Sequence, residues 1–404
     1  MDKNKRLTVW LPVIIAASIA LGIFIGNHYL SISQGKKRSY SSGNKINAIL
    51  DIIDEQYVDT VSMSKLVEST IPKIFSELDP HSVYIPAEDA SVVNEELEGS
   101  FSGIGVSFNM QTDTILVISV ISGGPAEKAG LLPFDRIISI NDSIFSGKKK
   151  NQGEIMKTLR GAKNSTVKLG VQRGNSPELL YFDVTRGDVP VNSVDVSYEA
   201  AKGIGYIKVS KFARNTYNEF ITAIAKLKQA GCTSFVIDLR GNTGGYMDAA
   251  INMINEFMPE GRLIVYTEGK SFPRSDVYAN GTGTCKDAPI VVLTDEISAS
   301  ASEIFSGAIQ DNDRGTIIGR RTYGKGLVQT QMSLSDGSEM RLTIARYYTP
   351  SGRCIQKKYE MGNTDAYDQD IYNRYMHGEF DSADSIKMDD SLKYQTVGGR
   401  TVYG

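Results

Sequence analysis

The spacing of apolar residues changes twice along this 404-residue chain, and those changes most limit the folds open to it. Residues 45–78 carry apolar side chains at helical spacing, and residues 99–187 hold short β-type runs between Gly, Asn and Asp turns. From residue 188 onward, apolar strands alternate with helices, which is typical of an α/β domain with a largely parallel sheet. The pattern predicts a multidomain α+β chain: a small helical segment (45–98), a β-rich domain (99–187) and an α/β domain (188–404).

The composition narrows the functional classes. With 44 basic and 47 acidic residues the net charge is -3, so the basic excess that nucleic-acid binding requires is missing. Cys232, Cys285 and Cys354 lie far apart without C-x-x-C spacing, and this predicts neither a metal site nor a disulfide framework, although one bridge stays open. We expect no nucleic-acid partner, no metal and no cofactor.

The N-terminus predicts a membrane anchor. Residues 1–7 are rich in basic side chains, and residues 8–26 are apolar and uncharged, a length that approaches the roughly 30 Å hydrocarbon core of a bilayer. A cleaved signal peptide is the alternative, but no clear A-x-A site follows. Both interpretations export the rest of the chain. We expect a short cytoplasmic tail, a single transmembrane helix, a linker over residues 27–44, and the remaining domains on the extracytoplasmic, periplasmic side of the cell membrane.

A glycine-rich turn opens the β-rich domain. Such a turn leaves backbone N–H groups free to bind a terminal carboxylate, and the strand after it can pair with an incoming peptide. This turn, residues 124–131 and residues 135–141 together resemble a PDZ domain. One departure is Phe134, which stands where the family usually places Gly. A small β-barrel of another kind is the alternative. The resemblance implies a peptide-binding loop made of Gly103, Ile104, Gly105 and Val106.

Two stretches of the α/β domain suggest catalysis. Three alternate serines, Ser298, Ser300 and Ser302, follow an apolar strand and precede a helix. A serine at such a turn can attack a carbonyl while nearby N–H groups stabilise the oxyanion. Further on, Lys325 lies between two glycines, and a buried lysine with a lowered pKa can act as general base. The residues alone equally fit a helix cap and an exposed turn.

A third stretch, residues 238–245, runs from a strand into a glycine-rich turn before a helix. This arrangement also suits phosphate binding, but the stretch matches neither nucleotide-binding glycine motif, so a nucleotide site is not expected.

Together with the turn at residues 78–82, these three stretches resemble the carboxy-terminal processing proteases of the S41 class over most of residues 45–355. That resemblance implies a crotonase-like protease domain and peptide hydrolysis by a Ser-Lys dyad. It assigns Ser300 as nucleophile, Lys325 as general base, Gln329 as the residue that holds the lysine amine, and Ala301 with Gly244 or Gly245, Gly244 first, as the oxyanion hole.

The resemblance also implies how substrates are selected. Proteins with apolar C-termini would bind the PDZ domain, and Arg160 is the candidate that links this domain to the active site, an exposed surface arginine being the alternative. A homo-oligomer and an adaptor protein stay open. After Gln356 the family pattern is replaced by a polar, tyrosine-rich segment, which leaves a C-terminally truncated enzyme as one interpretation.

Three functions follow as hypotheses. The first is an endopeptidase that cleaves exported or envelope proteins. The second is a membrane-tethered PDZ scaffold without proteolytic activity, and the third is an enzyme that handles acyl-CoA, suggested by the crotonase-like architecture. The intact Ser300, Lys325 and Gln329 favour the protease.

Overall fold

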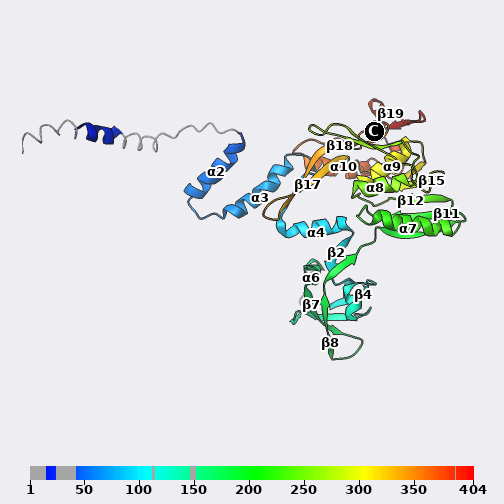
Figure 1. The fold of residues 1–404 in the computed structure, drawn as a ribbon, viewed down its shortest axis with the longest axis horizontal. Coiled ribbons are helices and arrows are strands. Elements are labelled where there is room, and N and C mark those ends of the chain that lie inside the picture. The colour runs from blue at the N-terminus through cyan, green and yellow to red at the C-terminus, as the bar shows by residue number, and fades with distance from the viewer. Residues whose placement is uncertain (1–14, 24–41, 112–113, 146–151, 387) are drawn as a thin grey trace, which may run out of the picture. The chain divides into compact units, whose positions relative to one another are not determined.

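The computed structural model describes residues 15–23, 42–111, 114–145, 152–386 and 388–404 (Figure 1). The chain divides into two compact units, Met1–Ser69 and Thr70–Gly404.

The predicted membrane span lies only partly within the described residues. Of residues 8–26, the structure describes 15–23, which are helical. Among the described residues, no helix is both long and apolar enough to cross a membrane. The anchor therefore stays a prediction.

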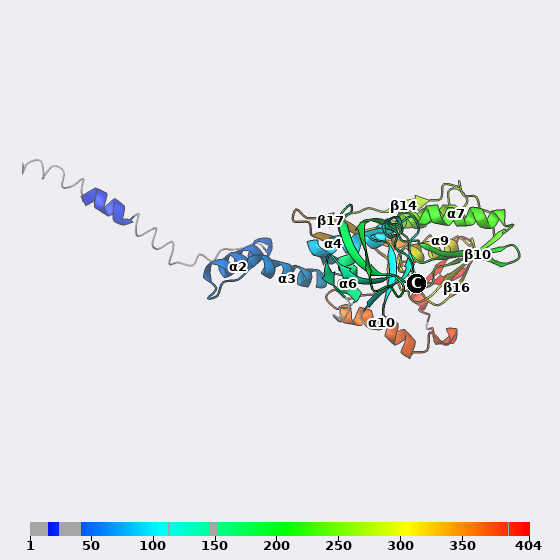
Figure 2. The same ribbon diagram turned by 90° about the horizontal axis from the view of Figure 1, so that it is seen from below.

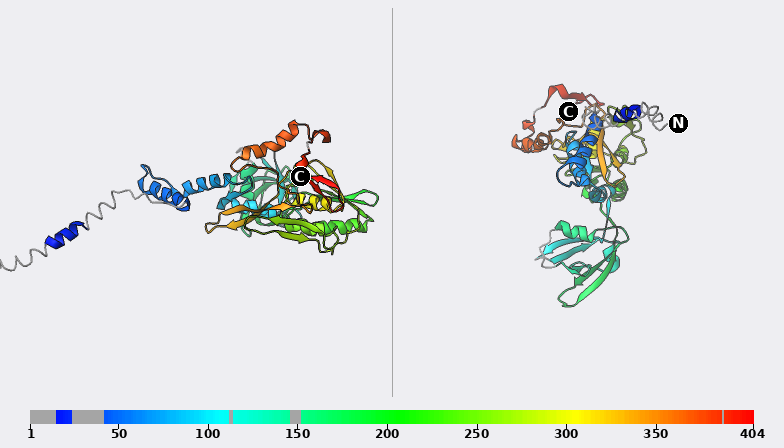
Figure 3. Two further views of the ribbon diagram at one scale, coloured as in Figure 1. Left: turned by 90° about the horizontal axis from the view of Figure 1, so that it is seen from above. Right: turned by 90° about the vertical axis from the view of Figure 1, so that its left-hand side faces the viewer.

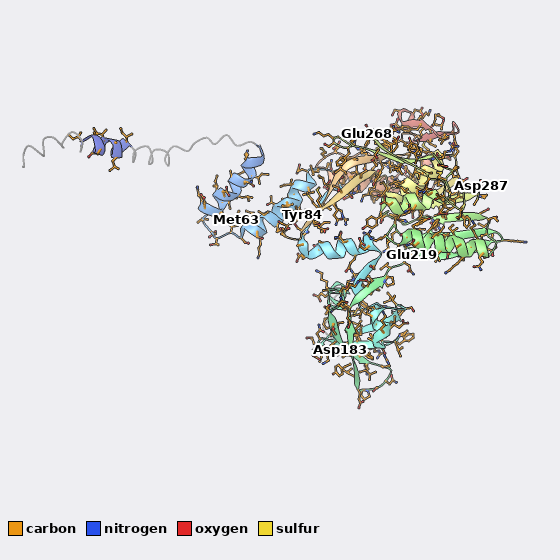
Figure 4. The ribbon with its side chains drawn as sticks, viewed as in Figure 1. Met63, Tyr84, Asp183, Glu219, Glu268 and Asp287 are labelled. Carbon is orange, nitrogen blue, oxygen red and sulfur yellow. The ribbon has the colours of Figure 1, made fainter. Side chains whose placement is uncertain are left out.

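The helices α2 (Ser42–Gln56) and α3 (Met63–Ser76) confirm the helical spacing that the sequence shows in this region. Met63, labelled in Figure 4, is the first residue of α3. On α2, Ile46, Ile49 and Ile52 are each about half exposed, and their spacing of three residues places them on one face. This face of α2 is apolar and accessible within the described part of the chain.

The segment after α3 contributes a strand to the last domain. Asp79 is buried and accepts hydrogen bonds from the N–H groups of His81 and Ser82, which closes the turn. The strand β1 (Val83–Ile85) then pairs antiparallel with β18 (Glu339–Tyr348), and Tyr84, labelled in Figure 4, lies opposite Met340. Helix α4 (Ala87–Glu98) leads from β1 to the β-rich part.

The PDZ-like part is an antiparallel sheet in the order β3-β4-β5-β7-β8, with β6 beside β5. The strands are β3 (Val106–Gln111), β4 (Thr114–Val120), β5 (Arg136–Ile140), β6 (Ser143–Ile144), β7 (Thr166–Gln172) and β8 (Leu179–Thr185). Asp183, labelled in Figure 4, lies on β8. The helices α5 (Pro125–Ala129) and α6 (Gln152–Leu159) complete this part. The separate ribbon of β2 (Ser100–Gly103) and β9 (Gly187–Pro190) brackets it in sequence.

Phe134 shows how the PDZ-like turn accommodates a residue other than glycine. Its φ is 71°, in the left-handed region that glycine adopts at no steric cost, and its side chain is 75% exposed. The next residue, Asp135, is buried and binds Arg173 at 2.8 Å. The turn therefore keeps the backbone geometry of a glycine while storing local strain.

The α/β domain is built on a five-stranded sheet in the order β10-β11-β12-β15-β16. The strands are β10 (Val194–Ala201), β11 (Ile204–Val209), β12 (Ser234–Asp238), β15 (Ile290–Thr294) and β16 (Thr316–Gly319). The pairs from β11 to β16 are parallel, whereas β10 is an antiparallel edge strand. This confirms the largely parallel sheet that the sequence predicts.

Three helices bury one face of this sheet: α7 (Thr216–Gln229), α8 (Met247–Asn255) and α9 (Ala301–Asp311) (Figure 1). Alternate residues of the central strands, such as Ile207, Ile237 and Val292, are fully buried in one core with these helices. Glu219 on α7, labelled in Figure 4, accepts hydrogen bonds from the N–H groups of Ser193 and Val194, which fixes the start of the domain.

A second sheet runs in the order β1-β18-β13-β14, with β17 also paired to β18. Its remaining strands are β13 (Leu263–Glu268), β14 (Ser275–Tyr278) and β17 (Leu327–Ser333). The tyrosine-rich segment then forms α10 (Thr364–Met376), the short helices η1 (Ala383–Ser385) and η2 (Asp390–Leu392), and a hairpin of β19 (Lys393–Gln395) and β20 (Thr401–Tyr403). All three cysteines are free thiols.

Candidate active site

Ser300 lies at a strained turn between β15 and α9. Its backbone has φ 55° and ψ −113°, which a residue with a side chain rarely adopts. Strain of this kind costs on the order of 1–3 kcal/mol and persists only where the surrounding structure enforces it. A sharp strand-to-helix turn of this type presents a serine hydroxyl at the edge of a sheet, as in the nucleophile turn of α/β-hydrolases.

The structure separates the three alternate serines by their hydrogen bonds. Ser298 and Ser302 are fully buried, and their hydroxyls donate to the carbonyl oxygens of Leu239 and Asn242, respectively. Both therefore serve to fasten the turn to the end of β12. Ser300 is partly exposed. Of the three, it is the residue placed to meet a substrate.

Lys325 follows β16 on a loop that packs against the Ser300 turn. The N–H of Tyr323, two residues before the lysine, donates to the carbonyl oxygen of Ser298 at 3.0 Å. Lys325 is flanked by Gly324, whose φ is 87°, and by Gly326. A Cβ at Gly324 would lie 2.9 Å from the Cβ of Lys357, so a glycine is required there both for space and for backbone conformation.

Glu303 joins the two loops. Its Oε2 accepts the backbone N–H of Ser300 and of Lys325, each at 2.8 Å. Its Oε1 accepts the N–H of Gly324 and the hydroxyl of Thr322, each at 2.7 Å. Four donors use the full accepting capacity of a carboxylate. Burial raises the pKa of Glu303, whereas these four hydrogen bonds favour the charged form.

The electrostatic environment of Lys325 suits a general base. Burial lowers the pKa of its amine, and the positive charge of Arg341 lowers it further, against the opposing charges of Asp79 and Glu303. A lower pKa enlarges the fraction of neutral amine, which is the form that accepts a proton from serine.

The residues predicted to form the oxyanion hole lie close to Ser300. Gly244 lies against the Ser300 turn: a Cβ placed on it would come within 2.7 Å of the Ser300 Cβ. Its own N–H donates to Asn242 Oδ1 at 2.8 Å. Within the described part of the chain, the N–H groups of Ala301 and Gly245 have no hydrogen-bond acceptor. As it stands, the structure therefore leaves Ala301 and Gly245 open to an oxyanion, while Gly244 would have to release Asn242.

Gln329 makes a different contact from the one expected. Its amide nitrogen donates to the carbonyl oxygen of His81, in the turn before β1. Among the hydrogen bonds of the described residues, its side chain does not reach the Lys325 amine, so its assigned role stays a prediction. The contact ties the strand that follows Lys325 to the buried turn around Asp79.

Glu303 was not among the site residues expected from the sequence. The signal was present, because Ser300-Ala301-Ser302-Glu303 has the S-x-x-E pattern of a capping box, in which the glutamate binds the N–H of the capping serine. The pair of Asp238 and Arg240 was also not among the expected site residues. Burial opposes ionisation of Asp238, but hydrogen bonds from Arg240 and Tyr206 outweigh it and lower its pKa to about 2.

The predicted peptide-binding loop lies between β2 and β3. Ile104 is buried, and the carbonyl oxygens of Ile104 and Gly105 accept the N–H groups of Ala126 and Ile121. The strand that begins at Val106 pairs with β4 on one side and is the edge of its sheet. Its other side can pair with an added peptide strand.

Arg160 contacts α4 rather than lying free on the surface. Its guanidinium binds Glu95 Oε2 at 3.2 Å and lies 4.4 Å from the ring centre of Phe101. Glu95 also accepts the N–H of Ser102, next to the peptide-binding loop. Arg160 is thus bonded to a helix outside the PDZ-like sheet.

A strained serine at a helix start, a lysine with a lowered pKa and free N–H groups beside the serine together define a serine hydrolase site. The comparisons with known proteins agree. The model of peptidase family S41 matches residues 203–365, and that of the PDZ domain matches residues 102–195.

Among curated relatives, the carboxy-terminal processing protease CtpB of Bacillus subtilis (strain 168) is 35% identical over 318 residues, covering 78% of this chain and 66% of that protein. A probable CtpA-like serine protease of Staphylococcus aureus (strain N315) is 33% identical over 365 residues, covering 88% of this chain and 72% of that protein. A solved photosystem II D1 C-terminal processing protease has a TM-score of 0.44 and 28% identity, over 78% of this chain and 91% of that one. The chain belongs to the carboxy-terminal processing proteases of peptidase family S41, a family of serine peptidases with a PDZ domain.

Proposed function

We propose that this chain is an endopeptidase that cleaves exported or envelope proteins and recognises their apolar C-terminal tails through its PDZ domain. The observation that carries the proposal is the joint attachment of Ser300 and Lys325 to Glu303, because it fixes a nucleophile and a base with a lowered pKa on two touching loops. The relatives named as proteases support this function over a non-proteolytic scaffold.

The chemistry follows from these groups. Neutral Lys325 takes the proton of the Ser300 hydroxyl as its oxygen attacks the scissile carbonyl carbon. The resulting oxyanion is stabilised by the N–H of Ala301 and of a glycine in the Gly244-Gly245 pair. The lysine ammonium then protonates the leaving amine, which breaks the C–N bond and leaves an acyl ester on Ser300. The same lysine, neutral again, then takes a proton from water as the water oxygen attacks the ester carbon. The C–O bond to Ser300 breaks, the lysine ammonium returns the proton to the serine oxygen, and the acid is released.

The contacts of α4 support a link between the two domains. Arg160 binds Glu95 in the last turn of this helix. At its end, Glu98 binds Arg214 at 2.7 Å and accepts the hydroxyl of Tyr246 at 3.0 Å. Tyr246 directly follows the Gly244-Gly245 pair. A tail bound in the PDZ domain could thus act on the oxyanion hole through Arg160 and α4, and this is the coupling role that we propose for Arg160.

The surroundings of the enzyme are also proposed. The basic N-terminus and the apolar residues 8–26 support a single-pass membrane anchor with the catalytic part on the extracytoplasmic, periplasmic side. The exposed face of Ile46, Ile49 and Ile52 on α2 supports a homo-oligomer through the helical segment. An adaptor protein that delivers substrates is compatible with the PDZ domain.

Cleavage of an unfolded reporter protein tests this function. The full chain in mild detergent is mixed with a reporter that ends in apolar residues and with a matched reporter that ends in two aspartates. We expect faster cleavage of the apolar-tailed reporter, and no cleavage by Ser300→Ala. A wild-type chain that binds the apolar tail without cleaving it would instead identify a scaffold.

A further inference from the structure

Helix α10 lies where the sequence departs from the family pattern, and most of it follows the matched residues 203–365. Figure 2 and the left view of Figure 3 show it in orange along one flank of the protease domain. The helix is largely exposed, and Tyr367 and Arg374 are its buried residues. They are seven positions apart, about two helical turns, so they lie on the same face.

Arg374 holds the loop that leads to Lys325. Its Nη1 donates to the carbonyl oxygen of Thr322 at 3.0 Å and its Nη2 to that of Arg321. Its Nε binds Glu379 at 3.2 Å, and Glu379 also binds Arg321 at 2.7 Å. With its side chain 5% exposed, Arg374 is fixed on all sides.

The loop that Arg374 holds is the one that Glu303 holds from inside. Thr322 offers its carbonyl oxygen to Arg374 and its hydroxyl to Glu303 Oε1. A single residue therefore separates α10 from the carboxylate that binds the N–H groups of Ser300 and Lys325. Displacement of Thr322 would reach both catalytic residues.

Tyr367 holds the same loop from its other end. Its hydroxyl lies 2.9 Å from His81 Nε2 and accepts the Gln356 amide at 3.2 Å. Gln356 in turn accepts the N–H of Gly326, the residue after Lys325, at 2.9 Å. The two buried residues of α10 thus act on both sides of the lysine.

If Arg374 only stabilised the fold, a buried guanidinium would not be needed at this position. A buried arginine is costly to desolvate, and an apolar residue of similar volume often stabilises a protein at least as well. What the guanidinium adds is direction, because its planar fork fixes two carbonyl oxygens at once.

We propose that α10 is a positioning element of the catalytic unit, which holds the Lys325 loop in register with the Ser300 turn through Arg374 and Tyr367. This inference rests on the proposed protease function. It gives the tyrosine-rich segment a role in catalysis although neither side chain touches substrate. Arg374 and Tyr367 are accordingly positioning residues.

The test compares Arg374→Gln with Arg400→Gln in the full chain. Arg400 is a matched control because it also lies in the C-terminal segment, with an ion pair to Asp313 and a hydrogen bond to a carbonyl oxygen, that of Gln310. We expect Arg374→Gln to lower kcat by about tenfold or more with KM unchanged, since a misplaced catalytic group costs rate rather than binding. The acid limb of the kcat/KM pH profile of Arg374→Gln should also move to higher pH. A loosened loop lets water reach the Lys325 amine, and this raises the pKa that burial lowers in the wild type.

Amide hydrogen exchange over residues 321–328 provides a readout that needs no activity. We expect faster exchange in Arg374→Gln than in wild type, and unchanged exchange in Arg400→Gln. If the wild-type chain cleaves nothing, the proposed function fails and exchange alone decides the positioning role. Wild-type exchange in Arg374→Gln, or an unchanged kcat in an active enzyme, would overturn the inference. If Arg374→Gln does not fold, Tyr367→Phe, which removes a single hydroxyl, is tested by the same two measurements. We then expect kcat to fall by about two- to fivefold and exchange over residues 321–328 to become faster.

Discussion

Ser300 and Lys325 donate their backbone N–H groups to the same oxygen, Oε2 of Glu303, at 2.8 Å each. The two residues are 25 positions apart in sequence and come from different loops, one before α9 and one after β16. A shared acceptor holds the two backbones close together. Glu303 therefore holds the backbone of the proposed nucleophile next to that of the proposed general base.

Replacement of Glu303 by glutamine is expected to be severe, although it preserves shape. Each carboxylate oxygen accepts two donors, so either orientation of the amide points an NH2 group at two further donors. We predict a loss of about 100-fold in kcat and of about 1–3 kcal/mol in the free energy of unfolding. Steady-state kinetics and urea denaturation measure both, and a variant with wild-type kcat would refute the organising role.

The pH dependence of kcat/KM should reflect the pKa of Lys325. The neutral amine is the active form, and burial lowers its pKa, so kcat/KM should rise with pH along a limb that lies below the ordinary lysine value of about 10.4. Arg341→Gln removes a positive charge that lowers this pKa, and should therefore move the limb to higher pH. A limb that moves to lower pH in Arg341→Gln would contradict the electrostatic account.

Burial of Lys325 should also lower the free energy of unfolding of the protein. Its pKa is lower in the folded than in the unfolded chain, so the unfolded chain binds more protons between the two values and stability rises with pH across that window. Lys325→Met should raise the free energy of unfolding at pH 7, and the gain should shrink toward the ordinary lysine pKa. Urea denaturation at several pH values tests this, with the exposed Lys202→Met as a control that should show no such gain.

Much of this arrangement could be predicted from sequence, because it depends on local patterns. The alternation of strands and helices predicted the parallel sheet. The serine run and the Gly-Lys-Gly turn alone fitted a helix cap and an exposed turn equally well, and the resemblance to the S41 proteases assigned Ser300 and Lys325. The roles that were missed depend on contacts between distant segments. Glu303 binds a loop about 20 residues away, and Arg374 holds residues more than 50 positions earlier. The side chain of Gln329 similarly donates to the carbonyl oxygen of His81, which lies 248 positions earlier in the sequence. Neither periodicity nor motif spacing reports such contacts.

The strained turn of the PDZ domain offers a stability test away from the active site. Phe134 has φ 71°, a conformation that costs a residue with a side chain about 1–2 kcal/mol. Phe134→Gly should relieve that strain and, after the added entropy of the unfolded chain, raise local stability by up to about 1 kcal/mol. Hydrogen exchange of peptides from β5 and β7 should slow accordingly.

The matched control is Asn164→Gly, since Asn164 has φ 67° and asparagine tolerates this region better than phenylalanine. It should give the smaller gain. An equal or larger gain at Asn164 would show that strain at Phe134 is not the cause.

The proposed mechanism depends on a dyad in which Ser300 acts as nucleophile and Lys325 as general base. Its most direct test is the rate of reporter cleavage by the full wild-type chain, Ser300→Ala and Lys325→Ala, with Lys202→Met as the control. Cleavage should be lost in both dyad variants, while the control should cleave at the wild-type rate. Cleavage that survives in Ser300→Ala would contradict the assignment of the nucleophile and, with it, the account of the site.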